Sequence, residues 1–335
     1  MREELTFEES FNPPATPEEI NSAESELAVK FPQEIRSIYT EYDGIPEYTC
    51  EHLPFHLMPL SEVVALNKIF RNETHISTLT KKYGLICLWG DDQSNYAGIY
   101  VDDPFKGKIC FVDHEAYYVG DLSPLFRNVQ SFTNRVVELA ERNRLVSQFE
   151  EGALKESELK AAVEKFPYSY NEYWSAASWH AMPVDYPAQN TSFLDEEDRQ
   201  CFELVSQVLN RGDFTLDNER QFLIYALARL TPYAAANTLL PLLEENDMYI
   251  PSHVCNTLWL RRCTAAIPYI ATLALKGNQN CRQSAEMTLA KFIVDGVPGA
   301  QDLAEARYKE LDGDSSSLKE TVKRFQASRA LMYQW

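Results

Sequence analysis

Residues Ala15 to Tyr48, ATPEEINSAESELAVKFPQEIRSIYTEYDGIPEY, predict two short helices in succession. Thr16, Pro17 and Glu19 form a typical helix start. The Thr16 hydroxyl can accept a hydrogen bond from an early backbone N–H, proline needs no donor at the first helical position, and Glu19 lies three residues after the cap. The first helix is therefore expected to begin here.

Phe31 and Pro32 separate the two helices, since the residue before a proline avoids the α region. Pro32 is expected in the first turn of the second helix, and Gly44 is placed to supply a left-handed end. Apolar residues recur at three- and four-residue spacing on one side of each helix. They are Ile20, Ala23, Leu27 and Phe31 in the first helix, and Ile35, Ile38, Tyr39 and Tyr42 in the second. We expect both helices to turn these faces to a core.

The composition predicts a folded protein of the cytoplasm. Its 335 residues suffice for about two domains, and a hydrophobic content of 45% can fill their cores. The opening residues MREELTFEES lack the features of a signal peptide, and the chain has no long uncharged apolar run. Its seven cysteines are scattered without a C-x-x-C pair, which favours free thiols in a reducing compartment.

The formal net charge of −19 limits the kind of partner. A negative field repels the phosphates of nucleic acids and speeds encounter with a basic protein surface. The alternative is that the acidity only keeps the protein soluble.

After the helix pair, short apolar stretches alternate with polar turns. A strand and a helix come first, then three strands whose polar connections suit antiparallel pairing, then a long amphipathic helix. The expected elements are a strand at 55–60, a helix capped by Ser61 with Val63, Val64, Leu66 and Ile69 on its face, strands at 85–89, 96–101 and 108–113, and a helix opened by Ser123 and Pro124 that includes Phe132 and Val137. This order predicts an α+β domain over residues 1–148, mainly an antiparallel sheet flanked by helices.

A connector and an all-α domain are expected in the rest of the chain. Residues 149–195 are too rich in aromatic residues for a flexible linker and are expected to clamp the two domains together. Leu227, Leu258 and Leu289 recur every 31 residues, and each is followed by a second apolar helix. Helix pairs repeated at about this period are typical of α-solenoids, so we expect a HEAT-like helical repeat domain over residues 196–335.

The motifs between residues 10 and 140 occur in a characteristic order. They are the proline-bounded second helix, the strand and helix of Leu57-Met58-Pro59-Leu60-Ser61-Glu62-Val63, the strand end Leu88-Trp89-Gly90-Asp91-Asp92, the aromatic strand at 96–101, and Asp113-His114-Glu115. This order resembles the SMI1/KNR4 family, also called the SUKH superfamily, although the glycine usual before Asn95 is missing. The resemblance implies a domain that binds proteins. For many bacterial members it implies an immunity protein that blocks a toxin domain, and for the fungal branch a scaffold or regulator.

Acidic residues follow the predicted strands. In a meander, successive turns alternate between the two ends of the sheet, so the turn of Asp91 and that of Asp113 would share an end. Aspartates in turns usually accept hydrogen bonds from backbone N–H groups. The sequence also lacks the motifs of a catalytic serine, a P-loop and a zinc site, so catalytic and metal sites are disfavoured. We predict instead an acidic rim that accepts Lys and Arg side chains of a partner. Its residues are Trp89, Asp91, Asp92, Tyr96, Asp113, His114 and Glu115.

Basic residues of the helical part have two interpretations. Arg229, Arg261, Arg262, Arg282 and Lys291 would form a basic stripe on a concave binding surface. Alternatively, the arginines stand near helix ends because cations are favourable in the last turn of a helix.

These observations predict a non-enzymatic, cytosolic protein-binding module without cofactor or metal. The favoured interpretation is an immunity protein that neutralises a basic, nuclease-type toxin domain, since an acidic inhibitor gains association rate and complementarity. The alternative is a scaffold or regulatory adaptor that binds several host proteins. Neither nucleic acid nor a membrane is expected as a partner.

Overall fold

The computed structural model describes residues 11–45, 53–72, 81–91, 94–112, 122–155, 157–159, 192–193, 195–212, 214, 219–245, 247 and 249–332. The chain forms two compact units. Unit 1 contains Met1–Ala176 and Phe214–Phe222, and unit 2 contains Ala177–Asp213 and Leu223–Trp335. The predicted domain limits at 148 and 195 stay predictions. Among the described helices, none is both long and apolar enough to cross a membrane.

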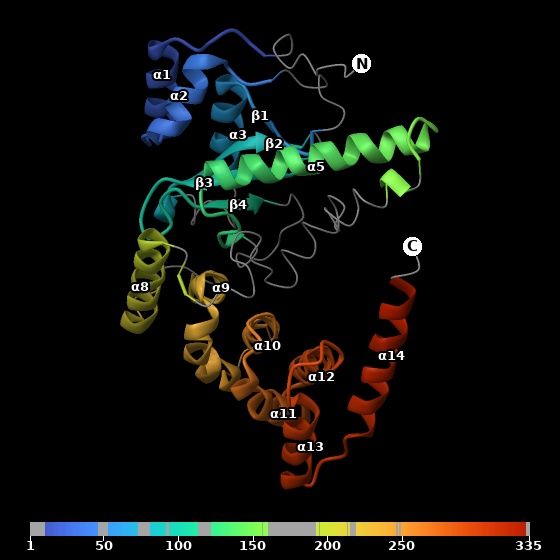
Figure 1. Cartoon of the computed structure of the whole chain (residues 1–335). Helices are drawn as coiled ribbons and strands as arrows, with labels where there is room; N and C mark the ends of the chain where they lie inside the picture. The colour runs from blue at the N-terminus through green and yellow to red at the C-terminus, as the bar shows by residue number, and fades with distance from the viewer. Residues whose placement is uncertain are drawn as a thin grey trace. The chain divides into compact units, whose positions relative to one another are not determined.

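Two short helices, α1 (Pro17–Leu27) and α2 (Gln33–Glu41), open unit 1 (Figure 1). The predicted cap of α1 is confirmed. The Thr16 hydroxyl accepts from the Glu19 N–H at 3.2 Å, and the Glu19 carboxylate accepts from the Thr16 N–H at 2.7 Å. Of the predicted apolar faces, the residues that are buried are Ile20, Ala23, Leu27, Phe31, Ile35 and Tyr39, and those that are partly exposed are Ile38 and Tyr42.

The link between α1 and α2 differs from the prediction. Ala28 takes a left-handed conformation (φ 48°) and ends α1 before Phe31 is reached, and Pro32 is the N-cap of α2 rather than a residue of its first turn. Gly44 is left-handed as expected (φ 75°), but it does not end the helix. A Cβ atom at Gly44 would lie 2.6 Å from the backbone of Met58, so glycine is required there by close packing.

A buried carboxylate joins α1 to α2. Glu24 is 1% exposed and accepts hydrogen bonds from the Phe31 N–H at 3.0 Å, from Lys30 Nζ at 2.7 Å and from Arg36 Nη1 at 2.6 Å. Burial by itself would raise the pKa of Glu24, but these hydrogen bonds outweigh it and hold the pKa below its usual range. One side chain therefore fixes both the link and the second helix.

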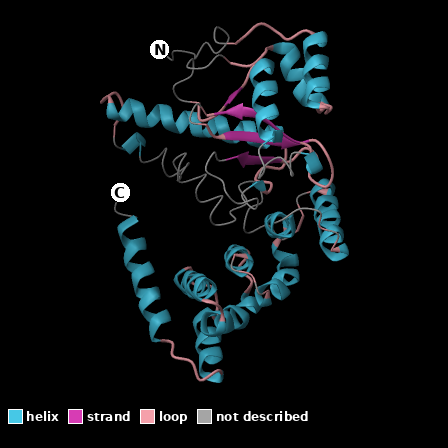
Figure 2. Ribbon diagram, turned by 180° about the vertical axis from the view of Figure 1, so that it is seen from behind, coloured by secondary structure: helices cyan, strands magenta, loops and turns pink. Residues whose placement is uncertain are grey.

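The sheet of unit 1 has the order β1-β2-β3-β4, and each strand is antiparallel to its neighbour (Figures 1 and 2). This confirms the predicted antiparallel sheet with flanking helices. The elements are β1 (His56–Leu57), β2 (Leu85–Gly90), β3 (Tyr96–Tyr100), β4 (Ile109–Val112), α3 (Leu60–Asn72) and α5 (Val129–Glu150).

Ring contacts show that α3 and α5 cover opposite faces of this sheet. Phe70 of α3 lies 5.5 Å from Tyr96 of β3, and Phe132 of α5 lies 4.8 Å from Trp89 of β2, measured between ring centroids. Trp89 pairs in register with Ala97, the neighbour of Tyr96 in β3. Because successive residues of a strand point to opposite faces, the two helices enclose the sheet between them.

A long-range hydrogen bond sets the start of α3, and a local cap formed by Asn128 and Ser131 sets the start of α5. The Leu60 N–H donates to Asp43 Oδ1 at 2.9 Å, so α3 begins one residue before the predicted cap Ser61. The predicted start of α5 at Ser123 was wrong, because the Phe126 N–H pairs with the Ile109 carbonyl at 3.0 Å and extends the sheet. Two predicted core residues are mainly exposed, Ile69 at 54% and Val137 at 57%.

A segment from late in the sequence completes unit 1. Helix α9 (Glu219–Leu230) begins in this unit. The Glu219 carboxylate is fully buried and accepts from Lys82 Nζ and, at 2.6 Å, from the Tyr83 hydroxyl. The Phe222 ring lies 5.5 Å from the Tyr83 ring and 5.2 Å from the Phe105 ring. The sequence pattern did not predict this contact.

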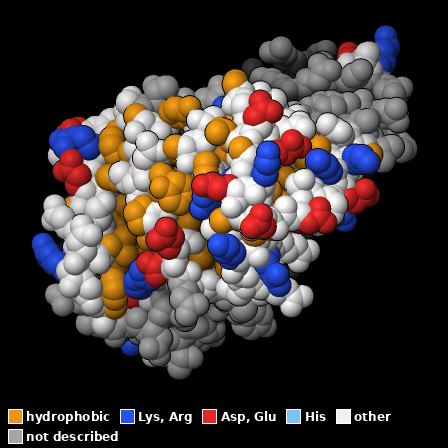
Figure 3. All heavy atoms as spheres, turned by 90° about the horizontal axis from the view of Figure 1, so that it is seen from below, with side chains coloured by type: hydrophobic (Ala, Val, Ile, Leu, Met, Phe, Trp, Pro, Cys, Tyr) orange, Lys and Arg blue, Asp and Glu red, His pale blue; other side chains and the backbone are white. Residues whose placement is uncertain are grey.

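Unit 2 consists mainly of helices, as predicted. Leu227, Leu258 and Leu289, from which the repeat was predicted, are all buried. Helix α10 contacts α12, and α11 contacts α13. The HEAT-like repeat itself stays a prediction. On the face seen from below, hydrophobic side chains gather among side chains of both charges (Figure 3). Besides α9, the helices of this region are α8 (Glu196–Arg211), η3 (Tyr233–Glu244), α10 (Ile250–Leu260), η4 (Thr264–Ala266), α11 (Ile267–Lys276), α12 (Gln279–Val294), α13 (Ala300–Glu310) and α14 (Ser316–Met332).

Two members of the predicted basic stripe lie in the core instead. Arg229 is fully buried and Arg261 is 1% exposed. Arg261 donates from Nε to the Thr231 carbonyl at 2.6 Å and from Nη2 to the Arg229 carbonyl at 3.2 Å. Its guanidinium thus caps the carboxyl end of α9, where a cation is favourable, although burial lowers the pKa of Arg261 to about 10. Arg261 thus stabilises a helix end, as predicted, but the end of α9 rather than of its own helix α10. A continuous stripe through Arg229 and Arg261 is excluded.

We predict that Glu24→Gln lowers the free energy of unfolding by about 2 kcal/mol, because hydrogen bonds to charged groups are lost while Lys30 and Arg36 can still reach water. Urea denaturation measures this change. Glu26→Gln is the matched control, since Glu26 pairs with Lys68 at the surface and should cost less than about 1 kcal/mol. Equal losses in the two variants would contradict the structural role of Glu24.

The contribution of Glu24 should depend on pH. Its pKa is lowered in the folded state, so the unfolded chain binds the proton more readily. The difference in unfolding free energy between the wild type and Glu24→Gln should be complete at pH 7. It should decline as the pH falls below about 4.3, the usual value for a glutamate, and through the lower pKa of the folded state. A difference that stays constant between pH 7 and pH 3 would contradict this.

Candidate partner-binding site

The structure describes three of the seven residues predicted to form the acidic rim. Asp92, Asp113, His114 and Glu115 lie outside the described residues. Trp89 is 6% exposed, and its ring packs on Phe132, so it contributes to the core beneath the rim and offers little surface to a partner. Asp91 and Tyr96 lie at the two ends of the β2–β3 connection and are both partly exposed.

Asp91 shapes the turn between β2 and β3. Its carboxylate accepts from the Asn95 N–H at 2.9 Å and from Asn95 Nδ2 at 2.7 Å. This is the turn-closing role that aspartates commonly have. Ser94 stands at the position where the sequence lacks the usual glycine, and it adopts the left-handed conformation itself (φ 68°).

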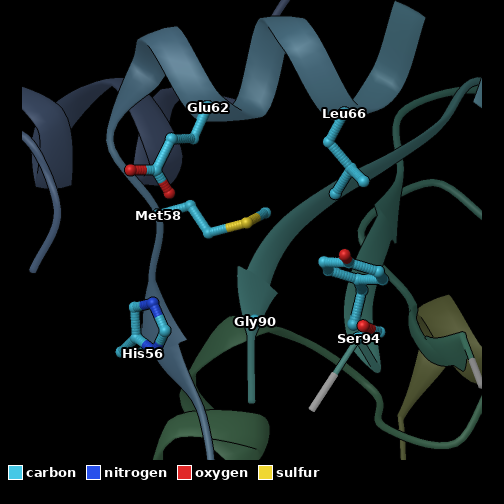
Figure 4. Close-up of a pocket in the computed structure, with 7 residues that line it drawn as sticks. His56, Met58, Glu62, Leu66, Gly90 and Ser94 are labelled. Carbon is cyan, nitrogen blue, oxygen red and sulfur yellow. The ribbon is translucent and has the colours of Figure 1, made fainter. Parts of the chain in front are cut away.

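Next to this turn lies a pocket of about 220 Å³ between β1, the first turns of α3 and the β2–β3 connection (Figure 4). His56 and Glu62 lie on one side of it, Leu66 lies on the other, and the Met58 side chain extends between them. The remaining lining residues are Gly90, Ser94 and Tyr96. A thioether, an aliphatic side chain and an aromatic ring therefore line a cavity that also presents a carboxylate and an imidazole.

Asn67 holds the strand behind this pocket, and the sequence pattern did not single it out. Its side chain is 2% exposed, accepts from the Cys87 N–H at 2.9 Å and donates to the Cys87 carbonyl at 2.8 Å. The Asn67 side chain thus supplies hydrogen bonds to β2 at a residue that β1 does not pair with, since β1 reaches only Trp89 and Gly90. Directly after Cys87 the register of β2 shifts, and the Leu88 carbonyl there accepts from the Met58 N–H at 2.9 Å.

The electrostatics of the pocket suit a cationic side chain. Burial, together with the nearby Cys87 and Asp91, raises the pKa of Tyr96, so its hydroxyl stays protonated at neutral pH. Glu62 is exposed on the first turn of α3 and can accept from a Lys or Arg head group, while Met58 and Leu66 can contact its alkyl stem. In the described part of the chain, no group of three or more His, Cys, Asp or Glu residues is arranged to hold a metal ion.

The N-terminal fold is thus an α+β domain with a four-stranded antiparallel sheet between helices. Residues 14–135 match the model of the SMI1/KNR4 family (SUKH-1), so this part of the chain is an SMI1/KNR4 (SUKH-1) domain. No curated protein matches the chain. The family match ends before the helical region.

We predict that Asn67→Leu costs about 3 kcal/mol of unfolding free energy, because the buried N–H and carbonyl of Cys87 lose their partners although the branching of the side chain is kept. Chemical denaturation measures the loss. Asn72→Leu is the control on the same helix, since Asn72 is exposed and, among the described residues, its side chain donates only to the Lys68 carbonyl of its own helix. An effect no larger than that of the control would show that Asn67 does not hold β2.

Proposed function

We propose that this chain is a cytosolic immunity protein whose SMI1/KNR4 domain binds and neutralises a basic toxin domain, of the nuclease type. The pocket beside the β2–β3 turn is the observation that supports this most directly. It combines apolar walls with the Glu62 carboxylate, which suits the Lys and Arg side chains of a basic surface. The association of this family with immunity proteins and the net charge of −19 support the same partner.

The proposed contact surface combines the predicted rim with the pocket. Tyr96 belongs to both and supplies a ring with a donor hydroxyl. Asp91 adds negative potential while it closes the turn, and Asp92, Asp113, His114 and Glu115 remain proposed acceptors. The domain works by occupying the surface of the toxin, so we propose no enzymatic activity and no cofactor.

The alternative is a scaffold or regulatory adaptor, and the stacked helices of unit 2 favour it. Helix α10 contacts α12, and α11 contacts α13, as neighbouring helix pairs of the proposed HEAT-like stack would. Such a stack would supply an interface for several host proteins. A pull-down separates the alternatives, since an immunity protein should retain one tight basic partner and an adaptor several.

We predict that Glu62→Lys weakens binding to the cognate toxin at least about tenfold, because it places a cation where a basic side chain is to be received. The toxin is taken from the gene next to that of this chain. Its affinity is measured by calorimetry, and rescue of growth is scored on co-expression.

Glu150→Lys is the control, because it makes the same charge change on an exposed residue at the end of α5, outside the pocket. It should bind and rescue as the wild type does. If no neighbouring toxin binds the wild type while several host proteins do, the immunity function is wrong. If Glu62→Lys and Glu150→Lys bind the toxin with equal affinity, the pocket is not part of the toxin-binding surface.

A further inference from the structure

Unit 2 contains a groove of about 380 Å³ that lies within the second-helix layer of the stack. The end of η3, one side of α11, the beginning of α12 and one residue of α13 form its walls. The lining residues that bear on binding are Leu243, Glu244, Tyr269, Leu273, Lys276 and Arg307. Neither the family match nor the acidic rim involves these residues.

The floor of the groove is apolar, and one wall is an exposed aromatic ring. Leu243 is buried at 3% exposure, Leu273 is partly buried, and Tyr269 is 44% exposed although it follows the buried Ile267 on α11. Exposed aromatic rings beside an apolar floor are typical anchors at protein contacts. Figure 3 shows that hydrophobic side chains are accessible on the face seen from below, with charged side chains among them.

The rim of the groove carries opposite charges that are not paired with each other. Glu244 is the last residue of η3, and Lys276 lies in the last turn of α11. Both side chains are exposed, and among the described residues neither has an ion-pair partner. Arg307, in contrast, is already held by Thr272 Oγ1 at 2.9 Å and by Glu310 at 2.6 Å, so it forms a fixed wall.

A second copy of this chain is a poor occupant for the groove. Each chain has a net charge of −19, so two copies repel each other. A segment with one basic and one acidic side chain would instead pair with Glu244 and Lys276 at once. An apolar side chain between them would enter the groove beside Tyr269 and Leu273.

We propose that this groove binds a short segment of another protein that carries an apolar side chain between a basic and an acidic residue. The basic residue pairs with Glu244, the acidic residue pairs with Lys276, and the apolar residue enters between Tyr269 and Leu273. The groove is thus a second protein-binding site, and it does not depend on the toxin-binding role of unit 1.

The test is to select a phage-displayed library of random twelve-residue peptides on the full-length wild-type chain. The enriched peptides should share an apolar residue between a Lys or Arg and an Asp or Glu. Tyr269→Ala should weaken them at least about tenfold, since the aromatic wall is removed. Tyr233→Ala is the control, because Tyr233 is similarly exposed at 42% on η3 but does not line the groove.

Charge reversal distinguishes recognition from a mere effect on folding. Selection on Glu244→Lys should enrich peptides with an acidic residue in place of the basic one, which no loss of stability can produce. The proposal is overturned if no peptide is enriched, if the enriched peptides bind Tyr269→Ala as tightly as the wild type, or if the consensus is the same for Glu244→Lys. It is also overturned if sedimentation shows a dimer that Tyr269→Ala dissociates, since the occupant would then be a second copy.

Discussion

The buried carboxylate of Glu24 is the contact on which the geometry of the N-terminal domain depends. It holds α2 against α1, and α2 in turn reaches the strand that carries the pocket: the Tyr39 hydroxyl donates to the Met58 carbonyl at 2.9 Å. Asp43, just after α2, caps α3 through the Leu60 N–H. Met58 and Glu62 therefore take their places because the helix pair is fixed. The helix pair contributes no residue to the pocket, yet it positions two of the residues that line it.

The caps, strands and antiparallel order could be predicted because they follow from local sequence. Thr16 with Glu19 specifies a helix start within four residues, and polar turns between apolar stretches specify a meander. The end of α1 at Ala28 could not be predicted in this way. Nor could the pairing of Phe126 with Ile109, a residue from another part of the chain, which excludes a helix start at Ser123. The actual cap of α5, Asn128 with Ser131, is local, and the sequence pattern did not single it out.

At the candidate site too, the sequence gives the type of each residue, whereas its role depends on contacts with distant parts of the chain. The sequence indicated that Trp89 and Asp91 stand at a strand end, but burial assigns Trp89 to the core, and two hydrogen bonds assign Asp91 to the turn. Asn67 looked like an ordinary polar residue of a helix, and only its bonds to Cys87 reveal its role. In the helical unit, the sequence left two interpretations of Arg261 open, a surface stripe and a cation at a helix end. Its burial and its hydrogen bonds to carbonyls at the end of the preceding helix exclude the stripe.

The contact of Glu219 with Lys82 and Tyr83 has a consequence for how the protein can be divided. Unit 1 takes residues from two separate stretches of the chain, and so does unit 2. The backbone therefore passes from one unit to the other three times, and no single break separates the two units with both complete. A gene fusion or truncation at the end of the matched family domain would leave Tyr83 and Phe105 without Phe222. The matched family domain therefore depends on Glu219 and Phe222, residues far beyond its own end, to cover Tyr83 and Phe105.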